Sequence, residues 1–333
     1  MADSLQSAPR PRPHPLVTAA AVALAAVLLY LSLRGIDWLR VWTVLRGASL
    51  PLVALVLAIF SVNLFARSLR WRVLLSAERR VTVPQAFWAT SAGYLGNNVL
   101  PARAGELVRT LMICAATGMS RVYVLATALS ERVVDALVLL SLSGVILLTL
   151  PTKPGWLAHA AIPVGVIGLA GVAAIVLVPL FEPFWERLLA ALPVPRRLRA
   201  AAEDMLRQGV LGIRSFHDRG RLARFLLITT FLWSVECLTT ILGARSLGIS
   251  FSIPVAFLLI AGLGLGSALP STPGYVGIYQ YVAVSVLTPF GYAKSDAIAY
   301  ILLFQAMNYS VLLVFGLIGF SRQRALAAQA PHE

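Results

Sequence analysis

The sequence predicts an all-α polytopic membrane protein with about six full spans and two re-entrant broken-helix hairpins in an inverted repeat. The first observation is composition: 59% of the 333 residues are hydrophobic, 13% are charged, and the mean hydropathy is +0.82. Soluble domains are about one quarter charged, so a soluble class is excluded. The second observation is a series of eight to ten apolar segments. The third is one Pro/Gly break that occurs twice, at 100–105 and 269–274.

Six of these segments approach the roughly 20 residues that a spanning helix needs. They lie at about 16–33, 51–66, 122–150, 157–180, 224–243 and 297–319. The first follows Arg10 and Arg12 as a secretory signal would, but it is long for a signal core and lacks a cleavage site. We expect an uncleaved span, a disordered tail at 1–15 and a second tail at 321–333. Residues 16–320 then form a single transmembrane domain.

Four shorter apolar runs form two pairs, each divided by one of the breaks. The pairs are 84–99 with 106–118, and 254–269 with 275–290. Proline removes a backbone donor and glycine loosens the chain, so each helix ends there and leaves free backbone groups. Such groups persist within a bilayer only where protein or a wet cavity surrounds them. Paired, interrupted segments of this kind indicate the central site of a transporter.

Arginine placement orients the chain. Arginines are concentrated after the second span and in a long loop at about 181–223, so both regions are predicted to be cytoplasmic. The turn at 151–155 and the loop carrying Arg34, Arg40 and Arg46 fall outside. The halves at 16–150 and 157–319 therefore begin on opposite sides, and the broken pairs enter from opposite faces to meet near the midplane. Within the 181–223 loop, apolar residues at helical spacing predict an interfacial amphipathic helix.

The net charge of +14 does not indicate nucleic acid, because the arginines lie in loops between spans. Cys114 and Cys237 are isolated in apolar surroundings. The four histidines lie at termini or at loop and span edges: His14, His159, His217 and His332. We expect no metal, no cofactor and no structural disulfide.

The first break is strongly polar for an apolar region. It contains Asn97, Asn98, Arg103, Glu106 and Arg109, and such groups are costly in a membrane unless they face protein, water or substrate. The guanidinium of Arg103 suits a phosphate, and a helix starting near Gly105, after Pro101, directs its positive end to the same place. Alternatively, Glu106 and Arg109 neutralise each other at i, i+3, and the asparagines cap free backbone groups. A role in binding is favoured for Arg103, and both interpretations stay open for Glu106 and Arg109.

Four further charged residues lie within predicted spans: Glu131, Arg132, Asp135 and Glu236. Glu131 and Asp135 share a helix face, and Arg132 can reach Asp135 at i, i+3. A structural ion-pair latch is favoured there over a proton relay. Glu236 is isolated, so it is the better candidate for proton coupling. It could instead pair with Arg245 or with an asparagine.

The second break is polar without charge. A headgroup path could be lined by its residues Pro270, Ser271, Thr272, Pro273, Gly274, Gly277 and Gln280. A simple turn is the alternative. Just before it, Gly262 and Gly266 at i, i+4 predict close helix packing rather than a nucleotide loop.

Three blocks together resemble a known family. They are Gly-x-x-x-Asn-x-x-x-Pro-x-Arg-x-Gly-Glu at 93–106, Glu-Arg-x-x-Asp at 131–135 and Pro-x-x-Pro-Gly-x-x-Gly at 270–277. They look like the transmembrane region of bacterial lysylphosphatidylglycerol synthase/flippase proteins and their standalone relatives. The resemblance implies a membrane domain that moves lipids between leaflets. A chain ending at Glu333 leaves no room for the soluble aminoacyl-transfer domain, so we expect no synthase activity. Gln280 stands where the resemblance implies a carboxylate, which argues against proton coupling by the second hairpin.

The sequence thus predicts a flippase or translocator of an anionic phospholipid or lipid-linked precursor, in a bacterial inner membrane with both termini cytoplasmic. Its expected partners are membrane lipids and not nucleic acid, while a homo-oligomer and a partner synthase stay open. The alternatives are a membrane-embedded enzyme or accessory scaffold acting on lipid phosphates, and a small-anion transporter.

Overall fold

The computed structural model describes residues 15–100, 104–150, 163, 166–170, 218–267 and 273–328, with main chain only at 15–22 and 323–328. In this part of the chain every regular element is a helix, and none is a strand. The α-helices are α1 (Pro15–Leu33), α2 (Trp38–Arg46), α3 (Leu50–Leu75), α4 (Val83–Val99), α5 (Gly105–Thr117), α6 (Arg121–Thr149), α10 (Arg219–Ser246), α11 (Ile253–Gly266), α12 (Ile278–Leu287) and α13 (Lys294–Ala328). Two 3-10 turns, η3 (Pro273–Tyr275) and η4 (Thr288–Phe290), flank α12.

Four of these helices, α3, α6, α10 and α13, are long and apolar enough to cross a membrane. The predicted class, a helical membrane protein, is confirmed. The predicted span at 157–180 lies almost wholly outside the described residues. So does the predicted amphipathic helix, because residues 171–217 are not described.

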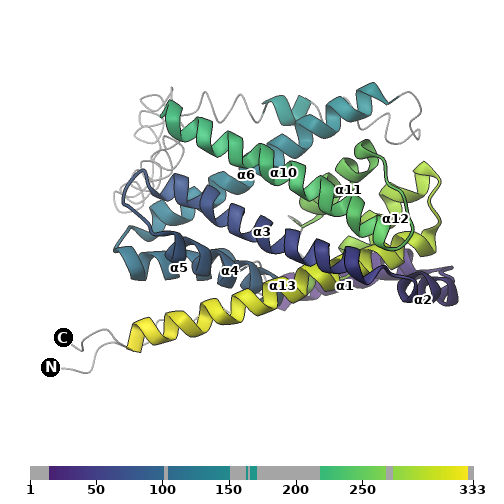
Figure 1. Cartoon of the computed structure of the whole chain (residues 1–333), viewed down its shortest axis with the longest axis horizontal. Coiled ribbons are helices and arrows are strands. Elements are labelled where there is room, and N and C mark those ends of the chain that lie inside the picture. The colour runs from purple at the N-terminus through teal and green to yellow at the C-terminus, as the bar shows by residue number, and fades with distance from the viewer. Residues whose placement is uncertain are drawn as a thin grey trace.

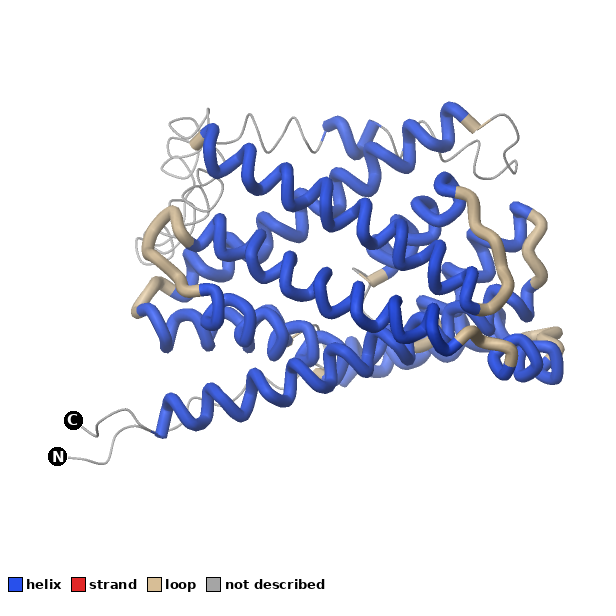
Figure 2. The backbone as a smooth tube through the Cα atoms, in the orientation of Figure 1, coloured by secondary structure: helices blue, strands red, loops and turns tan. Residues whose placement is uncertain are grey.

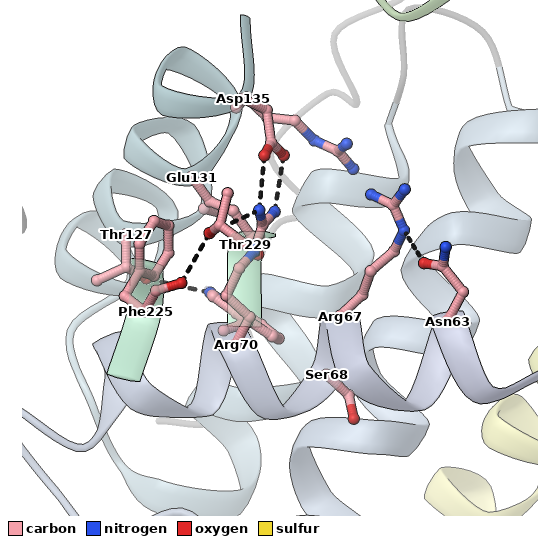
Figure 3. A network of polar contacts seen from close by, with 12 residues as sticks. Asn63, Arg67, Ser68, Arg70, Thr127, Glu131, Asp135, Phe225 and Thr229 are labelled. Atoms are coloured by element: carbon pink, nitrogen blue, oxygen red, sulfur yellow. Dashed lines mark hydrogen bonds and ion pairs between the residues drawn. The ribbon is translucent and has the colours of Figure 1, made fainter. Parts of the chain in front are cut away.

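One predicted span boundary is wrong in an informative way. The second span was placed at 51–66 with Arg67, Arg70 and Arg72 in a loop, but α3 continues to Leu75. Asn63, Arg67 and Arg70 recur at helical spacing and turn toward other helices instead of toward lipid or water (Figure 3). A prediction from hydropathy ends the span at residue 66 because it treats the charged residues that follow as exposed to solvent.

The helices run between two ends of the molecule, seen at left and right in Figures 1 and 2. At one end Arg79 donates to the carbonyl of Thr117 (2.8 Å) and Arg322 lies 4.7 Å from the ring centre of Trp88. We call this the basic end; α6 begins there at Arg121, and Arg221 lies in the first turn of α10. At the opposite end Arg40 binds Asp296 through two bonds (2.7 and 2.8 Å). The Ser49 amide donates to the Ser246 carbonyl (2.7 Å) at this end, so α3 and α10 are antiparallel.

Both predicted breaks interrupt a helix, and the resulting hairpins open toward different ends. The α4–α5 hairpin has its open side at the basic end, and α11–α12 has its open side at the opposite end (Figure 1). Their tips approach one another inside the molecule, where α4 contacts η3. The arms contain 17, 13, 14 and 10 residues, and an arm of 17 residues measures about 25 Å, less than a hydrocarbon core of about 30 Å.

Glycines let the arms of each hairpin pack closely. A Cβ on Gly105 would overlap the carbonyl oxygen of Gly93, and a Cβ on Gly96 would lie 2.9 Å from the Cα of Gly105. In the second hairpin, a Cβ on Gly262 would lie 2.8 Å from a methyl of Val282. A Cβ on Gly266 would lie 3.0 Å from a methyl of Ile278. The interpretation of Gly262 and Gly266 as packing residues is confirmed.

Candidate functional site

A cavity of about 240 Å³ lies where the two hairpin tips meet, between α3, α4, α6, α10 and α13. Leucine, isoleucine, valine and phenylalanine side chains form much of its wall. The polar residues of its wall are Asn63, Arg67, Tyr94, Asn97, Asn98, Arg132, Asp135, Glu236, Ser267, Tyr275, Tyr279 and Asn308. A polar pocket with charges of both signs among apolar helices marks this region as the candidate site.

Arg70 is the centre of a buried ion network beside the cavity (Figure 3). Its side chain is 1% exposed and is held by two carboxylates of α6. Nη1 and Nη2 donate to the two oxygens of Asp135 (2.6 and 2.7 Å), and Nε donates to Glu131 (2.9 Å). Two parallel bonds to one carboxylate are the strongest geometry available to arginine. The pairing joins one cation of α3 to two carboxylates of α6 and so fixes α3 against α6.

A second group of contacts joins α5 to this network. Arg109 donates through Nε to Glu106 (2.6 Å) and through Nη1 to Glu131 (3.1 Å). Arg132 also donates to Glu106 through Nε (3.0 Å), as does the amide of Asn97 (3.1 Å). Glu106 therefore receives two arginines and one amide. Removing a single partner from such a buried set would leave an uncompensated charge.

A third group faces the cavity. Arg67 donates through Nε to the Asn63 carbonyl oxygen (2.8 Å) and through Nη2 to Oε2 of Glu236 (3.0 Å). The amide of Asn63 donates to the same Glu236 oxygen (2.8 Å). Arg67 and Glu236 are 17% and 16% exposed, so this pair is more open than the Arg70 network. It links α3 to α10 across the cavity wall.

The three groups together contain equal numbers of positive and negative side chains within the described residues. The cations are Arg67, Arg70, Arg109 and Arg132, and the anions are Glu106, Glu131, Asp135 and Glu236. The formal charge of this set is zero. Electroneutrality explains how so many charges remain inside an apolar helix bundle, because each one is paired.

Two of the four arginines keep donors for a ligand. Arg67 and Arg132 line the cavity, and in the part of the chain that the structure describes no hydrogen bond is made by Nη1 of either residue. Arg132 is 25% exposed. The ring of Tyr94 lies near both guanidinium groups, with centroid distances of 5.9 Å for Arg67 and 5.0 Å for Arg132. The site thus offers two positioned guanidinium groups to an anion.

The residues predicted around the first break divide into three sets. Asn97 and Asn98 line the cavity, and their side-chain oxygens are buried without a partner among the described residues. Glu106 and Arg109 form the predicted i, i+3 pair within the adjacent network. Gly105 begins α5, as predicted. Pro101 and Arg103 lie outside the described residues, so the role of Arg103 stays a prediction.

The residues predicted around the second break form a structural tip. Gln280 is buried, accepts from the Gly277 amide (2.8 Å) and donates to Gln305 (2.6 Å). Gln305 donates to the Gly274 carbonyl (3.1 Å). Pro273, Gly274, Gly277 and Gln280 are absent from the cavity wall, which Tyr275 and Tyr279 line instead. Pro270, Ser271 and Thr272 lie outside the described residues.

One predicted pairing is wrong, and one of the two alternatives predicted for Glu236 is confirmed. Arg132 was expected to reach Asp135, but it binds Glu106 on α5, while Asp135 binds Arg70 on α3. Glu236 was given two alternative partners, Arg245 or an asparagine. The asparagine alternative is confirmed, because Asn63 donates to Glu236, and Arg67 is a further partner that was not predicted. In both cases a partner on another helix is closer than the partner on the same helix.

Sequence reasoning missed several residues of the site: Asn63, Arg67, Arg70, Tyr94, Trp233 and Asn308. For three of them a signal existed, because 63, 67 and 70 have the spacing i, i+4, i+7 that places side chains on one helix face. A polar stripe that continues the apolar helix at 51–66 predicts a helix with a polar interior face. Among the described residues, no three His, Cys, Asp or Glu side chains gather as a metal site would require.

Comparison with known proteins identifies two similarities. A family model described as the lysylphosphatidylglycerol synthase TM region matches residues 18–316. A curated relative, Glycosyltransferase AglD of Haloferax volcanii, is 26% identical over 329 residues, covering 88% of this chain and 51% of the relative. The chain thus spans about half the length of that relative. No solved structure matches the chain.

Proposed function

Because the chain belongs to the lysylphosphatidylglycerol synthase transmembrane-region family, we propose that it is a lipid translocator of the flippase kind. Its cargo is the anionic headgroup of a phospholipid or of a lipid-linked precursor. The protein carries this headgroup between the leaflets of a bacterial inner membrane, with both termini in the cytoplasm. The acyl chains remain in the lipid phase while the headgroup crosses.

The observation that carries this proposal is the pair of guanidinium groups on the cavity wall. Arg67 and Arg132 each have a free Nη1 among the described residues and lie near the same tyrosine ring. A phosphodiester has two unesterified oxygens that accept from such donors, and the apolar surroundings strengthen these contacts. Arg103, which belongs to the first Pro/Gly break of the sequence, is proposed as a third donor on the basis of the sequence.

The two hairpins supply a route for alternating access. We propose that they are re-entrant and form the paired elements of an inverted repeat, since their arms are short and they open toward opposite ends. Movement of one tip relative to the other would open the cavity first to one leaflet and then to the other. The basic end faces the cytoplasm in this arrangement, because it carries Arg79, Arg121, Arg221 and Arg322.

The test is lipid transfer in vesicles that contain the purified protein. Fluorescent phosphatidylglycerol is placed in both leaflets, and the fraction protected from a membrane-impermeant reducing agent is followed over time. Substitution Arg132→Gln is expected to slow transfer about 10-fold to 100-fold, because a charge-assisted hydrogen bond contributes about 1.5 to 3 kcal/mol. Arg46→Gln, at the opposite end of the molecule and outside the cavity, is the matched control. Equal rates in protein-containing and empty vesicles would refute the proposal.

Two further variants separate charge from structure. Arg67→Gln combined with Glu236→Gln removes both members of an ion pair and keeps the site neutral, so lost transfer cannot be assigned to an unpaired carboxylate. Arg103→Ala tests the donor predicted from the sequence. If Arg103→Ala transfers lipid at the parental rate, Arg103 is removed from the proposal, while the roles of Arg67 and Arg132 are unaffected.

A second candidate is favoured by the relative's name. A protein named as a glycosyltransferase matches this chain over about half of its own length, so handling of a sugar-bearing lipid phosphate, by transport or by group transfer, is the alternative. Incubation of the purified protein with a nucleotide sugar and radiolabelled polyprenyl phosphate distinguishes these activities. A glycosylated product would favour the enzyme, whereas transfer between leaflets without product favours the translocator.

A further inference from the structure

Among the four carboxylates of the ion network, Glu236 receives the fewest hydrogen bonds from arginine, one against two for each of the others. Glu131 and Glu106 each bind two arginines, and Asp135 receives two bonds from one arginine. Both contacts of Glu236, from Arg67 and from Asn63, go to Oε2. Its Oε1 has no hydrogen-bond partner among the described residues. Glu236 also lines the cavity, so this carboxylate is the one that a cargo or a water molecule can reach with a free oxygen.

We propose that Glu236 is the binding site for a proton that enters together with each anionic headgroup, which makes the translocator a proton–anion cotransporter. This inference rests on the proposed function, since it assigns an energy coupling to the same cavity. The step is a protonation: the carboxylate of Glu236 takes one proton from water and becomes a neutral carboxyl group. The proton leaves again when the headgroup departs, and no other bond is made or broken.

Proton binding is coupled to headgroup binding because Glu236 and the headgroup compete for the guanidinium of Arg67. Arg67 contacts the Glu236 carboxylate through Nη2 (3.0 Å) and also lines the cavity, and its Nη1 makes no hydrogen bond among the described residues. A phosphodiester that draws this guanidinium toward itself leaves Glu236 with Asn63 as its hydrogen-bond donor. A carboxylate with so little compensation in an apolar bundle is costly, and protonation removes the cost. Arg67 therefore serves as the counter-ion of Glu236 in the empty site and of the headgroup in the loaded site.

The charge balance of the site leads to the same result. The described residues of the network sum to zero, so a bound phosphodiester gives the set a charge of −1. Uptake of one proton returns the sum to zero. Glu131, Asp135 and Glu106 keep their arginines when Arg67 moves, because their bonds come from Arg70, Arg109 and Arg132. The proton therefore goes to Glu236.

Other charged and titratable groups line the cavity with Glu236 or lie beside it. They are Arg67 on α3, Tyr94 on α4, Arg132 and Asp135 on α6, Cys237 on α10 itself, Tyr275 in η3, Tyr279 on α12 and Tyr300 on α13. The tyrosines and the cysteine are neutral near pH 7, and the arginines stay protonated throughout. Asp135 is the other carboxylate on the cavity wall, and Arg70 fixes both of its oxygens. These groups therefore leave Glu236 as the site that changes its charge.

The first experiment measures proton uptake on binding. Dihexanoyl phosphatidylglycerol is titrated into the detergent-purified protein by calorimetry in buffers of different ionisation enthalpy. We expect about one proton to be taken up per lipid bound, and affinity to rise by up to about tenfold for each unit of decrease in pH. In Glu236→Gln, which resembles the protonated form, uptake falls to near zero and the affinity becomes independent of pH. Glu78→Gln, at an exposed turn outside the cavity, retains the parental behaviour.

A second measurement uses the parental protein and so does not depend on the folding of a variant. Infrared difference spectra with and without dihexanoyl phosphatidylglycerol should contain the C=O stretch of a newly protonated carboxyl group. Binding without this band and without proton uptake overturns the inference while leaving the proposed function intact. Proton-linked binding without lipid transfer in vesicles supports the protonation of Glu236 but refutes both the translocator and the cotransport. No binding at any pH overturns both.

Discussion

At the residue scale, the same side-chain type has two roles in this protein. Arg70 and Arg109 are buried, and each binds two carboxylates. Arg67 and Arg132 instead line a cavity, and Nη1 of each makes no hydrogen bond among the described residues. The difference is set by how many acceptors surround each guanidinium. Buried arginines stabilise the bundle only while every partner remains, and cavity arginines are available to a ligand.

Removal of the Arg70 side chain is therefore expected to be severe. Arg70→Ala leaves Glu131 and Asp135 without their shared cation and should destabilise the protein by about 3 to 5 kcal/mol. Arg80→Ala, at an exposed position after α3, should change stability by less than about 0.5 kcal/mol. The measurement is thermal unfolding in detergent, followed by size-exclusion chromatography. Equal midpoints for the two variants would contradict the assigned role of Arg70.

Local pairs at this scale could be predicted from the sequence, and distant pairs could not. Glu106 and Arg109 are separated by one helical turn, so their contact follows from spacing alone. Arg70 and Asp135 are 65 residues apart, and Arg67 and Glu236 are 169 apart. Nothing in a single sequence fixes which helices are neighbours, so both cations were assigned to a loop. Charged residues within the predicted spans indicated a polar interior, but they did not indicate which residues would bind one another.

At the element scale, the two breaks behave as their proline and glycine content predicts, although their chemistry differs from expectation. The first tip carries charged and amide groups into the network, while the second is closed by Gln280, Gln305 and the backbone of Gly274 and Gly277. A buried glutamine that caps a helix is a structural residue. The cavity-facing groups near the second tip are aromatic, Tyr275 and Tyr279, and their rings stack at 5.0 Å.

The crossing of α4 and α5 is expected to be intolerant of a single methyl group. In Gly105→Ala the new Cβ would overlap the Gly93 carbonyl oxygen and the backbone nitrogen of Asn97, so the two helices must separate. We expect destabilisation of about 1 to 3 kcal/mol or more and weakened lipid binding, since Asn97 moves with α4. In Gly47→Ala the Cβ meets ordinary contacts at 3.5 and 3.6 Å, and stability should be nearly unchanged. Thermal unfolding of both variants provides the comparison.

At the scale of the whole molecule, composition and arginine placement predicted the class and the order of the apolar segments. The structure adds that Arg79, Arg121, Arg221 and Arg322 lie at one end, where α3 and α5 finish and α6 and α10 begin. Hydropathy alone could not have placed the C-terminal end of α3. The last turns of this helix carry charged residues that face other helices, so their composition resembles that of a loop.

This arrangement predicts which segments face each side of the membrane. In a protein with Cys114 and Cys237 replaced by alanine, Glu78→Cys at the basic end should react with an impermeant maleimide only after the membrane is opened. Arg34→Cys, exposed between α1 and α2, should react in intact spheroplasts. The positive-inside bias is the physical reason. The reverse pattern would place the basic end outside and contradict the proposed topology.

The long separation between partners in the ion network also constrains how the protein is made. Arg67 is synthesised 169 residues before Glu236, and Arg70 is synthesised 61 residues before Glu131. At roughly 5 to 20 residues per second, Arg67 waits for about 8 to 34 s before its partner emerges from the ribosome. During that time an unpaired arginine in hydrocarbon would be costly. The third helix therefore has to remain beside the insertion machinery, or shallow in the bilayer, until later helices arrive, so membrane integration is linked to the completion of tertiary contacts.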